Sequence, residues 1–258
     1  MRVVKEYWQT AEALGGDDFW GRMLLFLRLA GIPLRKKIFG LRPRRLKLEY
    51  EGRVFALCIR DGADVAVLRE VFAEQEYATA QPAPKKIIDI GSHMGASAAF
   101  FACRYPEARI IAYEPDPRNF LLLQENMRQF PLVSCEQAAV SDRAGERPFF
   151  ANKTSSISSS LLRRGGSEEE LHVRSVSLLD ILQRENPDLV KFDAEGGEWD
   201  MFASAGVELK RCGTFVGEVH FDLIKKSEEE FTALFSGFEY SERSVGHHRS
   251  IFFFYLRA

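Results

Sequence analysis

A turn that carries two glycines, at residues 89–95, is the first place in the chain where the residue types could do chemistry. Its sequence is Asp-Ile-Gly-Ser-His-Met-Gly, and it follows a short apolar run. Gly91 lets the backbone turn sharply and lets a ligand approach closely, because it has no side chain. Gly95 allows the next helix to pack closely on the strand. Glu114 ends the following apolar run, where a carboxylate can accept hydrogen bonds from both hydroxyls of a ribose.

This combination indicates a cofactor that contains adenosine. NAD needs a second glycine beside its pyrophosphate, and His93 stands there instead, so its ring would crowd that group. S-adenosylmethionine has no pyrophosphate and therefore fits the turn better. A glycine turn that binds no ligand is the structural alternative. Ser141 and Asp142 follow the strand expected to flank adenine. The predicted cofactor contacts are Asp89, Gly91, Ser92, His93, Gly95, Glu114, Pro115, Ser141 and Asp142.

Four more polar residues follow two later apolar runs. Asp193 and Glu195 come after the run that ends at residue 192, and Glu218 and His220 close the run 213–220. The carboxyl ends of neighbouring parallel strands meet at one edge of a sheet, so we expect these four side chains to converge on one cleft. The structural alternatives are that Asp193 caps the next helix and that His220 is a packing histidine.

The elements that must position these residues alternate between strands and helices. Strands are predicted at 87–90, 109–113, 132–138, 188–193 and 213–220, and helices at 96–104, 119–129, 197–204 and 226–235. An antiparallel pair at the sheet edge is predicted at 238–240 and 250–256. This alternation predicts an α/β fold with a doubly wound, mainly parallel sheet, and ligands bind such sheets outside the carboxyl ends of the strands.

The part of the chain before this alternation has a different pattern. Two strands at 46–50 and 53–59 are predicted around a Glu51-Gly52 turn, and a helix at 63–74 follows them. The proline-containing segment 81–84 then breaks the chain. We therefore divide the sequence into an amino-terminal appendage of helices and a hairpin, residues 1–80, and a main domain, residues 81–258.

The formal net charge of -2 conceals an uneven distribution of charge. No Asp or Glu occurs between residues 22 and 48, whereas that stretch holds Arg22, Arg28, Arg35, Lys36, Lys37, Arg42, Arg44, Arg45 and Lys47. The rest of the chain is correspondingly acidic. A basic field over the whole protein is thus excluded, and nucleic acid is not an expected partner.

Apolar residues precede this basic stretch, and the two together suit an anionic membrane surface or an acidic substrate, bound through residues 20–48. The alternative is a helical lid packed on the core with solvated charges, because the apolar residues do not form a clean helical stripe. They are Trp20, Met23, Leu24, Phe26 and Leu27. No secretory signal is evident, and no apolar stretch reaches the ~18 residues of a membrane span.

Four cysteines are scattered without a CxxC pair, which indicates reduced thiols rather than a zinc or disulfide framework. We expect a cytoplasmic protein. If the basic segment binds a membrane, we expect that contact to be peripheral and at the inner membrane face. The sequence leaves the oligomeric state open.

Several segments, taken in order, resemble the FkbM-type S-adenosylmethionine-dependent methyltransferases. The resemblance covers about residues 70–256, and no part of the chain before residue 46 has a counterpart. Its motifs lie at 71–77, 88–95, 113–120, 139–142, 176–182, 190–198 and 218–220. It implies the class I methyltransferase (Rossmann-like) fold, with seven strands and the last one antiparallel. It also implies methyl transfer to a hydroxyl of a sugar, glycolipid or natural product. The sequence departs from the family at His93, where Asn or Gly is usual, and at Gly197, where Ala is common.

Methyl transfer to a hydroxyl is an in-line displacement, and an alcohol is a poor nucleophile at neutral pH. A base or a metal ion is therefore expected. In one mechanism His220 is the general base, held in its tautomer by Glu218 or Asp193. In the other, Asp193, Glu195, Glu218 and His220 hold a divalent cation such as Mg²⁺, which acidifies the hydroxyl. Both mechanisms remain open at this point.

The remaining polar residues receive simpler interpretations. Glu198 is expected on a solvated helix face, His172 is expected to be structural, and His247 and His248 are expected at the surface of a loop that could reach the acceptor. The serine-rich segment 155–160 is either a loop that closes over the site or an ordinary flexible loop.

Two other functions compete with methyl transfer to oxygen. A nitrogen or RNA methyltransferase is disfavoured, because Asp-Ala-Glu-Gly stands at residues 193–196 in place of an [ND]PP[YF]-like tetrapeptide. A binding module would use the basic segment to attach to a membrane or polyanion, without turnover.

Overall fold

The computed structural model describes residues 2–33, 42–79, 83–152, 159–162, 168–244 and 249–257. Its largest sheet has seven strands in the order β11-β12-β10-β9-β3-β4-β5. Strand β12 runs antiparallel to both of its neighbours, and the other pairs are parallel. The strands are β3 (Lys86–Ile90), β4 (Arg109–Tyr113), β5 (Val133–Glu136), β9 (Leu189–Phe192), β10 (Thr214–His220), β11 (Phe238–Ser244) and β12 (Arg249–Leu256).

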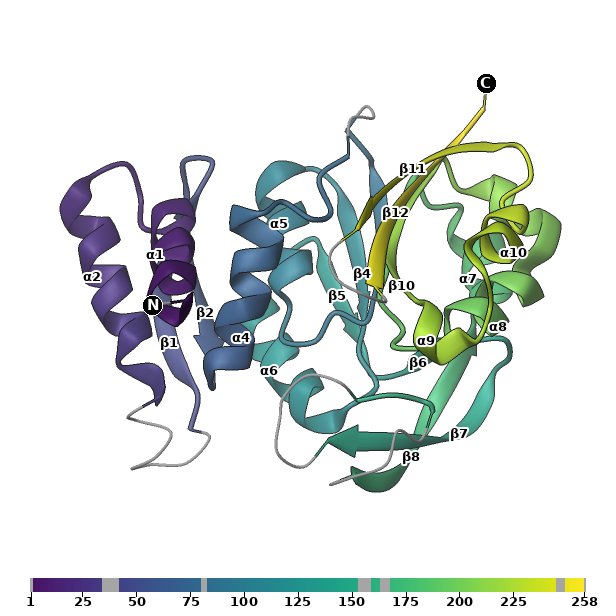
Figure 1. Ribbon diagram of the computed structural model, residues 1–258, viewed down its shortest axis with the longest axis horizontal. Coiled ribbons are helices and arrows are strands. Elements are labelled where there is room, and N and C mark those ends of the chain that lie inside the picture. Colours follow the sequence, from purple (N-terminus) through teal and green to yellow (C-terminus); the bar gives the residue numbers. More distant parts are fainter. Residues whose placement is uncertain are drawn as a thin grey trace.

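Helices cover both faces of this sheet (Figure 1). On one face lie α5 (Ala96–Arg104) and α6 (Pro117–Met127), and on the other lie α7 (Leu178–Glu185), α8 (Glu198–Ala205) and α10 (Glu228–Ala233). The short helices η2 (Gly206–Arg211) and α9 (Phe221–Ile224) join the second set to the sheet. The predicted doubly wound, seven-stranded class I methyltransferase sheet is therefore confirmed, including its antiparallel last strand.

The local sequence explains why these elements form where they do. Every residue of β9 and β10 is buried, as a strand covered on both faces requires. Helix α7 begins at the side-chain cap of Ser177 and ends at Asn186, which adopts the left-handed conformation. Helix α10 begins with a capping box formed by Ser227 and Glu230.

The amino-terminal part packs onto the α5 side of the sheet. It consists of α1 (Arg2–Leu14), α2 (Phe19–Ala30), β1 (Arg44–Tyr50), β2 (Arg53–Ile59), α4 (Gly62–Leu68) and the π-helix η1 (Arg69–Ala73). The predicted hairpin is confirmed, because β1 pairs antiparallel with β2. Phe72 of η1 contacts Tyr50 and Phe100 with ring centroids 5.0 and 5.8 Å apart. One hydrophobic cluster thus joins this part to α5, and the division into two domains at residue 80 stays a prediction.

The sequence did not predict a second, three-stranded sheet at the lower edge of the molecule in Figure 1. Its strands are β6 (Ala139–Ser141), β7 (Gly145–Asn152) and β8 (Glu168–Ser177), in the order β6-β8-β7. Residues 81–82, 155–158, His247 and His248 lie outside the described residues, so the predictions made for them are not addressed. Within the described ranges, no helix is both long and apolar enough to cross a membrane.

Candidate active site

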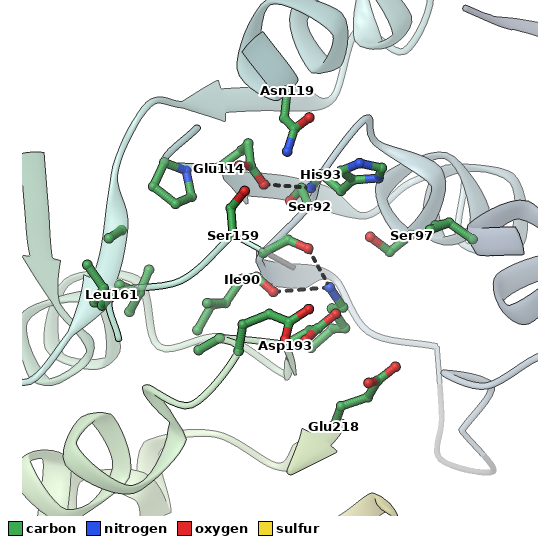
Figure 2. Close-up of a pocket in the computed structure, with 18 of the residues that line it drawn as sticks. Ile90, Ser92, His93, Ser97, Glu114, Asn119, Ser159, Leu161, Asp193 and Glu218 are labelled. Carbon is green, nitrogen blue, oxygen red and sulfur yellow. Dashed lines mark hydrogen bonds between the residues drawn. The ribbon is translucent and has the colours of Figure 1, made fainter. Parts of the chain in front are cut away.

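A pocket lies at the carboxyl ends of β3, β9 and β10, where the sequence predicted it (Figure 2). Glu114 stands on one side of it, and Asp193 and Glu218 stand on the other. The amino-terminal part also contributes to the wall, through residues of α4, η1 and the segment after them. Those residues are Val67, Glu70, Val71 and Tyr77. The pocket is therefore built from both sides of residue 80.

The glycine turn has the geometry that its sequence requires. Gly91 has a φ of +71°, and a Cβ at this position would lie 2.0 Å from the carbonyl oxygen of Asp193. The N–H groups of Gly91 and Ser92 both donate to the carbonyl of Tyr113 at 3.0 Å. A Cβ on Gly95 would lie 2.9 Å from a side-chain carbon of Leu123. The turn thus brings the chain close to β9 and α6, and only glycine fits at these two positions.

Asp89 and Lys191 stabilise the glycine turn through buried polar contacts. Asp89 is buried, accepts a hydrogen bond from the Ser97 hydroxyl at 2.7 Å, and has its other oxygen 3.3 Å from the Lys191 ammonium. Lys191 also donates to the carbonyls of Ile90 and Gly91 at 3.1 and 2.8 Å. Asp89 is not among the described residues that line the pocket, and its contact with the cofactor stays a prediction. Sequence reasoning did not single out Lys191.

Glu114 is buried at the pocket wall, beside Pro115. One carboxylate oxygen accepts from the N–H of His93 at 2.8 Å, and the other accepts from the N–H of Asp116 at 2.9 Å. Burial raises the pKa of Glu114 to about 7, although these two backbone hydrogen bonds act in the opposite direction. The carboxyl group is therefore fixed in position and titrates near neutral pH.

His93 is held by two residues of the amino-terminal part. Its Nε2 lies 3.0 Å from a guanidinium nitrogen of Arg60 and 3.6 Å from a carboxylate oxygen of Asp64. Arg60 also donates to both oxygens of Asp64, at 3.1 and 2.9 Å, and to Asn119 at 2.7 Å. His93 itself has a φ of +51°, in the left-handed region. Sequence reasoning missed Arg60 and Asp64, because no local pattern links them to the turn.

Ser141 and Asp142 lie away from the pocket wall. The Ser141 hydroxyl is 2.6 Å from that of Ser175, and Asp142 pairs with Arg147 at 2.7 Å. On this side the described wall is apolar instead. It is formed by Ala138, Ala139, Val140 and Phe149. Neither Ser141 nor Asp142 is among the described residues that line the pocket, and their contact with adenine stays a prediction.

The four predicted catalytic residues do come together. Asp193, Glu195 and Glu218 line the pocket, and His220 lies against the last two. Its Nε2 is 3.4 Å from Glu195 and 3.7 Å from Glu218. The convergence expected from the strand ends is thus present in the structure.

Glu198, expected on a solvated helix face, is instead buried beneath this cluster. Its carboxylate accepts from the N–H of Gly196 at 2.9 Å and lies 3.0 Å from Nδ1 of His220. Glu195 and Gly196 both have positive φ, and this bend turns the first residue of α8 inward. The expectation for Glu198 was wrong, because helical periodicity alone does not show how a loop orients the first turn of a helix.

His220 is a cation at neutral pH. Burial alone lowers the pKa of His220, but the hydrogen bond and charge of Glu198, with the charges of Asp193 and Glu195, raise it from 6.5 to about 10. His220 is not among the described residues that line the pocket. It therefore lies behind the carboxylates as an imidazolium that they surround.

One carboxylate oxygen of Asp193 makes no hydrogen bond within the described part of the chain. Its Oδ1 is buried and has no hydrogen-bond partner among the described residues. The alternative that Asp193 caps α8 was wrong, because the N-cap is Gly197 and no side chain caps that helix. Ligand atoms of Asp193, Glu195 and His220 all lie within 4.8 Å of one another, so this group could hold a divalent cation.

Tyr77 completes the wall next to Glu218. Its hydroxyl donates to Glu218 at 3.4 Å, and the Lys191 ammonium lies 5.1 Å from the centre of its ring. Burial and the charge of Glu218 raise the pKa of Tyr77 well above its ordinary value, so the phenol keeps its proton. Tyr77 thus orients Glu218 from the segment that precedes β3.

Residues 89–249, more than half of the chain, match the family model described as the methyltransferase FkbM domain. The chain belongs to this family. The resemblance seen in its motifs is therefore confirmed.

Two relatives and one solved structure are similar to this FkbM-family chain. Methyltransferase sdnD of Sordaria araneosa is 24% identical over 195 residues, which cover 62% of this chain and 71% of the relative. The 2-O-methyltransferase NoeI of Sinorhizobium fredii (strain NBRC 101917 / NGR234) is 36% identical over 63 residues, or 24% of this chain and 26% of the relative. The structure of methyltransferase FkbM from Methylobacillus flagellatus KT has a TM-score of 0.52 at 12% identity. That match covers 98% of this chain but only 59% of the solved chain, and it shows a shared fold.

Proposed function

We propose that this FkbM-family chain is an S-adenosylmethionine-dependent O-methyltransferase that acts on a hydroxyl of a sugar, glycolipid or natural product. The observation that carries the proposal is one pocket with two chemically distinct ends. A glycine turn with a fixed acid, Glu114, forms one end, and a group of carboxylates around Asp193 forms the other. The 2-O-methyltransferase named among the relatives supports a hydroxyl acceptor.

The first end fits the nucleoside half of the cofactor. Glu114 can accept hydrogen bonds from ribose hydroxyls, and the apolar wall at residues 138–140 can pack against adenine. Gly91, Ser92 and His93 line the pocket between the two ends, where the methionine portion would pass. S-adenosylmethionine supplies, when bound, a methyl group on a positively charged sulfur. The carboxylates at the other end favour that positive charge.

The second end fits an acceptor that carries hydroxyl groups. We assign to Asp193 the role of accepting the hydrogen bond of the reacting hydroxyl and its proton, because Oδ1 is buried at the pocket without a described partner. Glu195 and Glu218 offer further acceptors to neighbouring hydroxyls, as a sugar would present them. Orientation of the acceptor by several such hydrogen bonds contributes to the rate by holding it in line.

His220 receives a different role from the general base considered first. A group with a pKa of about 10 is almost wholly protonated at pH 7, and His220 is not among the described residues that line the pocket. We propose that it is a positioning residue, whose positive charge holds Glu195 and Glu218 together. In the second candidate arrangement, Asp193, Glu195 and His220 bind a divalent cation. The ion would then replace the proton on one imidazole nitrogen of His220.

The compartment follows from the thiols. All four cysteines are free, which supports the proposed location in a reducing compartment such as the cytoplasm.

The proposal is tested by binding and transfer together. Calorimetry should detect S-adenosylhomocysteine binding to the wild type, and Glu114→Ala should weaken it strongly. Mass spectrometry of glycan, glycolipid and polyketide panels should then detect a methylated product. Asp193→Asn should lose transfer but keep cofactor binding, whereas Glu146→Gln, an exposed carboxylate on β7, should keep both.

Four results would contradict parts of this proposal. Absence of S-adenosylhomocysteine binding would exclude the cofactor. Binding without transfer to any acceptor would favour a binding module, and methylation of amines alone would exclude the oxygen acceptor. Loss of transfer in EDTA, with recovery on addition of Mg²⁺, would favour the metal over the carboxylate base.

A further inference from the structure

Helix α2 is apolar on two opposite sides. Leu25 and Leu29 are buried in the cluster that joins the amino-terminal part to α5. Trp20, Leu24 and Leu27 are 77%, 51% and 58% exposed. Their spacing of i, i+4 and i+7 places these three side chains in one stripe along the outer face of the helix. The sequence showed no clean stripe because the buried and exposed apolar residues alternate along the same helix.

This stripe is unusual for a helix at the surface. A helix that is apolar all round is normally covered on all sides, and a contiguous exposed apolar patch marks an interaction site. Within the described part of the chain, no segment covers the stripe. Phe19, also exposed, extends it by packing edge-to-face on Trp20 with ring centroids 5.5 Å apart.

Positive charge lies beside the stripe. Arg28 is in the last turn of α2, four residues after Leu24. The Arg44 guanidinium reaches the carbonyl of Arg28 at 3.5 Å, which brings the start of β1 to the same end of the helix. Arg42, just before β1, is exposed. The sequence holds no acidic residue between positions 22 and 48 that could neutralise these charges.

We propose that α2 docks on an anionic lipid bilayer, with Trp20, Leu24 and Leu27 in the interface and the arginines on the headgroups. Tryptophan and leucine beside arginine are the side chains that interfacial helices use. A dissolved polyanion would bind the arginines but would not cover the exposed apolar stripe. A second copy of the chain would cover the stripe, but a two-fold contact would bring like-charged arginine clusters together.

The length of α2 determines how it would sit in the membrane. Twelve residues at about 1.5 Å each give ~18 Å, well short of the ~30 Å hydrocarbon core. Docking is therefore peripheral and parallel to the surface. Each arginine near the surface adds attraction that salt screens, so binding should depend on both anionic lipid and ionic strength.

Vesicle co-sedimentation of the full chain tests this proposal. We expect binding to vesicles of phosphatidylcholine with about one third phosphatidylglycerol, and little binding to phosphatidylcholine alone. The double variant Leu24→Glu/Leu27→Glu should lower the partition coefficient at least about tenfold, because it removes two apolar contacts and adds two repelled charges. Both side chains are exposed, so the melting temperature should not change.

The matched control is Val207→Glu. Val207 is 80% exposed on η2, next to the hydrophobic cluster on the opposite face of the sheet. This variant should bind vesicles as the wild type does. A second arm, Arg42→Ala/Arg44→Ala, should weaken binding to anionic vesicles and reduce its salt dependence.

Several outcomes would overturn the proposal. One is absence of binding to vesicles of any anionic content, and another is undiminished binding of the double leucine variant. A third is a dimer in light scattering that dissociates in that variant, which would assign the stripe to a second copy. Binding to heparin without binding to vesicles would assign the basic end to a polyanion.

Discussion

The affinity for S-adenosylhomocysteine should depend on pH through one residue, Glu114. Its carboxyl group is buried at the pocket wall and has a pKa of about 7 in the free protein, above the ordinary value of 4.5. Ribose hydroxyls donate hydrogen bonds, so they bind the ionised carboxylate better than the neutral acid. Binding should therefore release a proton, and affinity should fall as the pH falls below 7.

The size of the effect follows from the fraction of ionised carboxylate. With a pKa of about 7, Glu114 is roughly nine-tenths ionised at pH 8 and roughly one-tenth ionised at pH 6. Apparent affinity scales with the fraction of protein that is competent to bind, so it should drop about tenfold between these pH values. At pH 6 the wild type should release close to one proton for each molecule bound.

Isothermal titration calorimetry in two buffers of different ionisation enthalpy measures both quantities. Glu114→Gln is the test variant, and its affinity should be nearly independent of pH because an amide does not titrate. It should also bind at least about tenfold more weakly at pH 8, since a charged hydrogen bond is lost and the amide cannot accept from both His93 and Asp116. Glu146→Gln should keep the wild-type profile.

Two results would refute this reasoning. A wild-type affinity that stays constant between pH 6 and 8, with no proton released, would mean that the ligand does not contact ionised Glu114. The same slope in Glu114→Gln would mean that another group titrates on binding.

Three further variants test the positions around the pocket. Gly91→Ala should unfold the turn or destabilise the protein by more than about 2 kcal/mol in urea denaturation, because its Cβ would lie 2.0 Å from the Asp193 carbonyl at a positive φ; wild-type stability would contradict this. Arg60→Ala should weaken S-adenosylhomocysteine binding at least about threefold with little change in the transfer rate at saturation, because Arg60 holds His93; an unchanged affinity would remove Arg60 from the site. His220 has a raised pKa, so it stabilises the fold fully below pH 6.5 and loses that contribution as the pH rises toward about 10. Wild-type stability should therefore decline over this window and Glu198→Gln should flatten the decline, whereas equal slopes would show that Glu198 does not hold His220 protonated.

The elements that the sequence predicted best are those whose burial leaves a simple pattern. Strands β9 and β10 are buried and mainly apolar, and the glycine turn is marked by residues that the backbone geometry requires. The three-stranded sheet was missed because β8 is rich in exposed glutamates and does not look like a strand. The π-helical turn η1 was also missed, because its sequence continues the α-helical periodicity of α4.

Sequence reasoning predicted the site residues that lie at the carboxyl ends of neighbouring strands. It missed the residues that reach the site from distant segments of the chain. Asp193 follows β9 and Glu218 lies near the end of β10, and these strands are neighbours, so topology alone brings the two residues together. Arg60 and Glu198 act through partners that only the tertiary fold supplies. The amino-terminal part was interpreted as an appendage, yet its Val67 and Val71 line the pocket. A local pattern does not record which distant surface a helix will face.

A crystal structure of the S-adenosylhomocysteine complex tests the central proposal most directly. We predict ribose hydroxyls within hydrogen-bonding distance of Glu114, adenine against residues 138–140, and the sulfur facing the carboxylates of Asp193 and Glu218. A ligand bound elsewhere, or a sulfur directed away from these carboxylates, would contradict the proposed O-methyltransferase site.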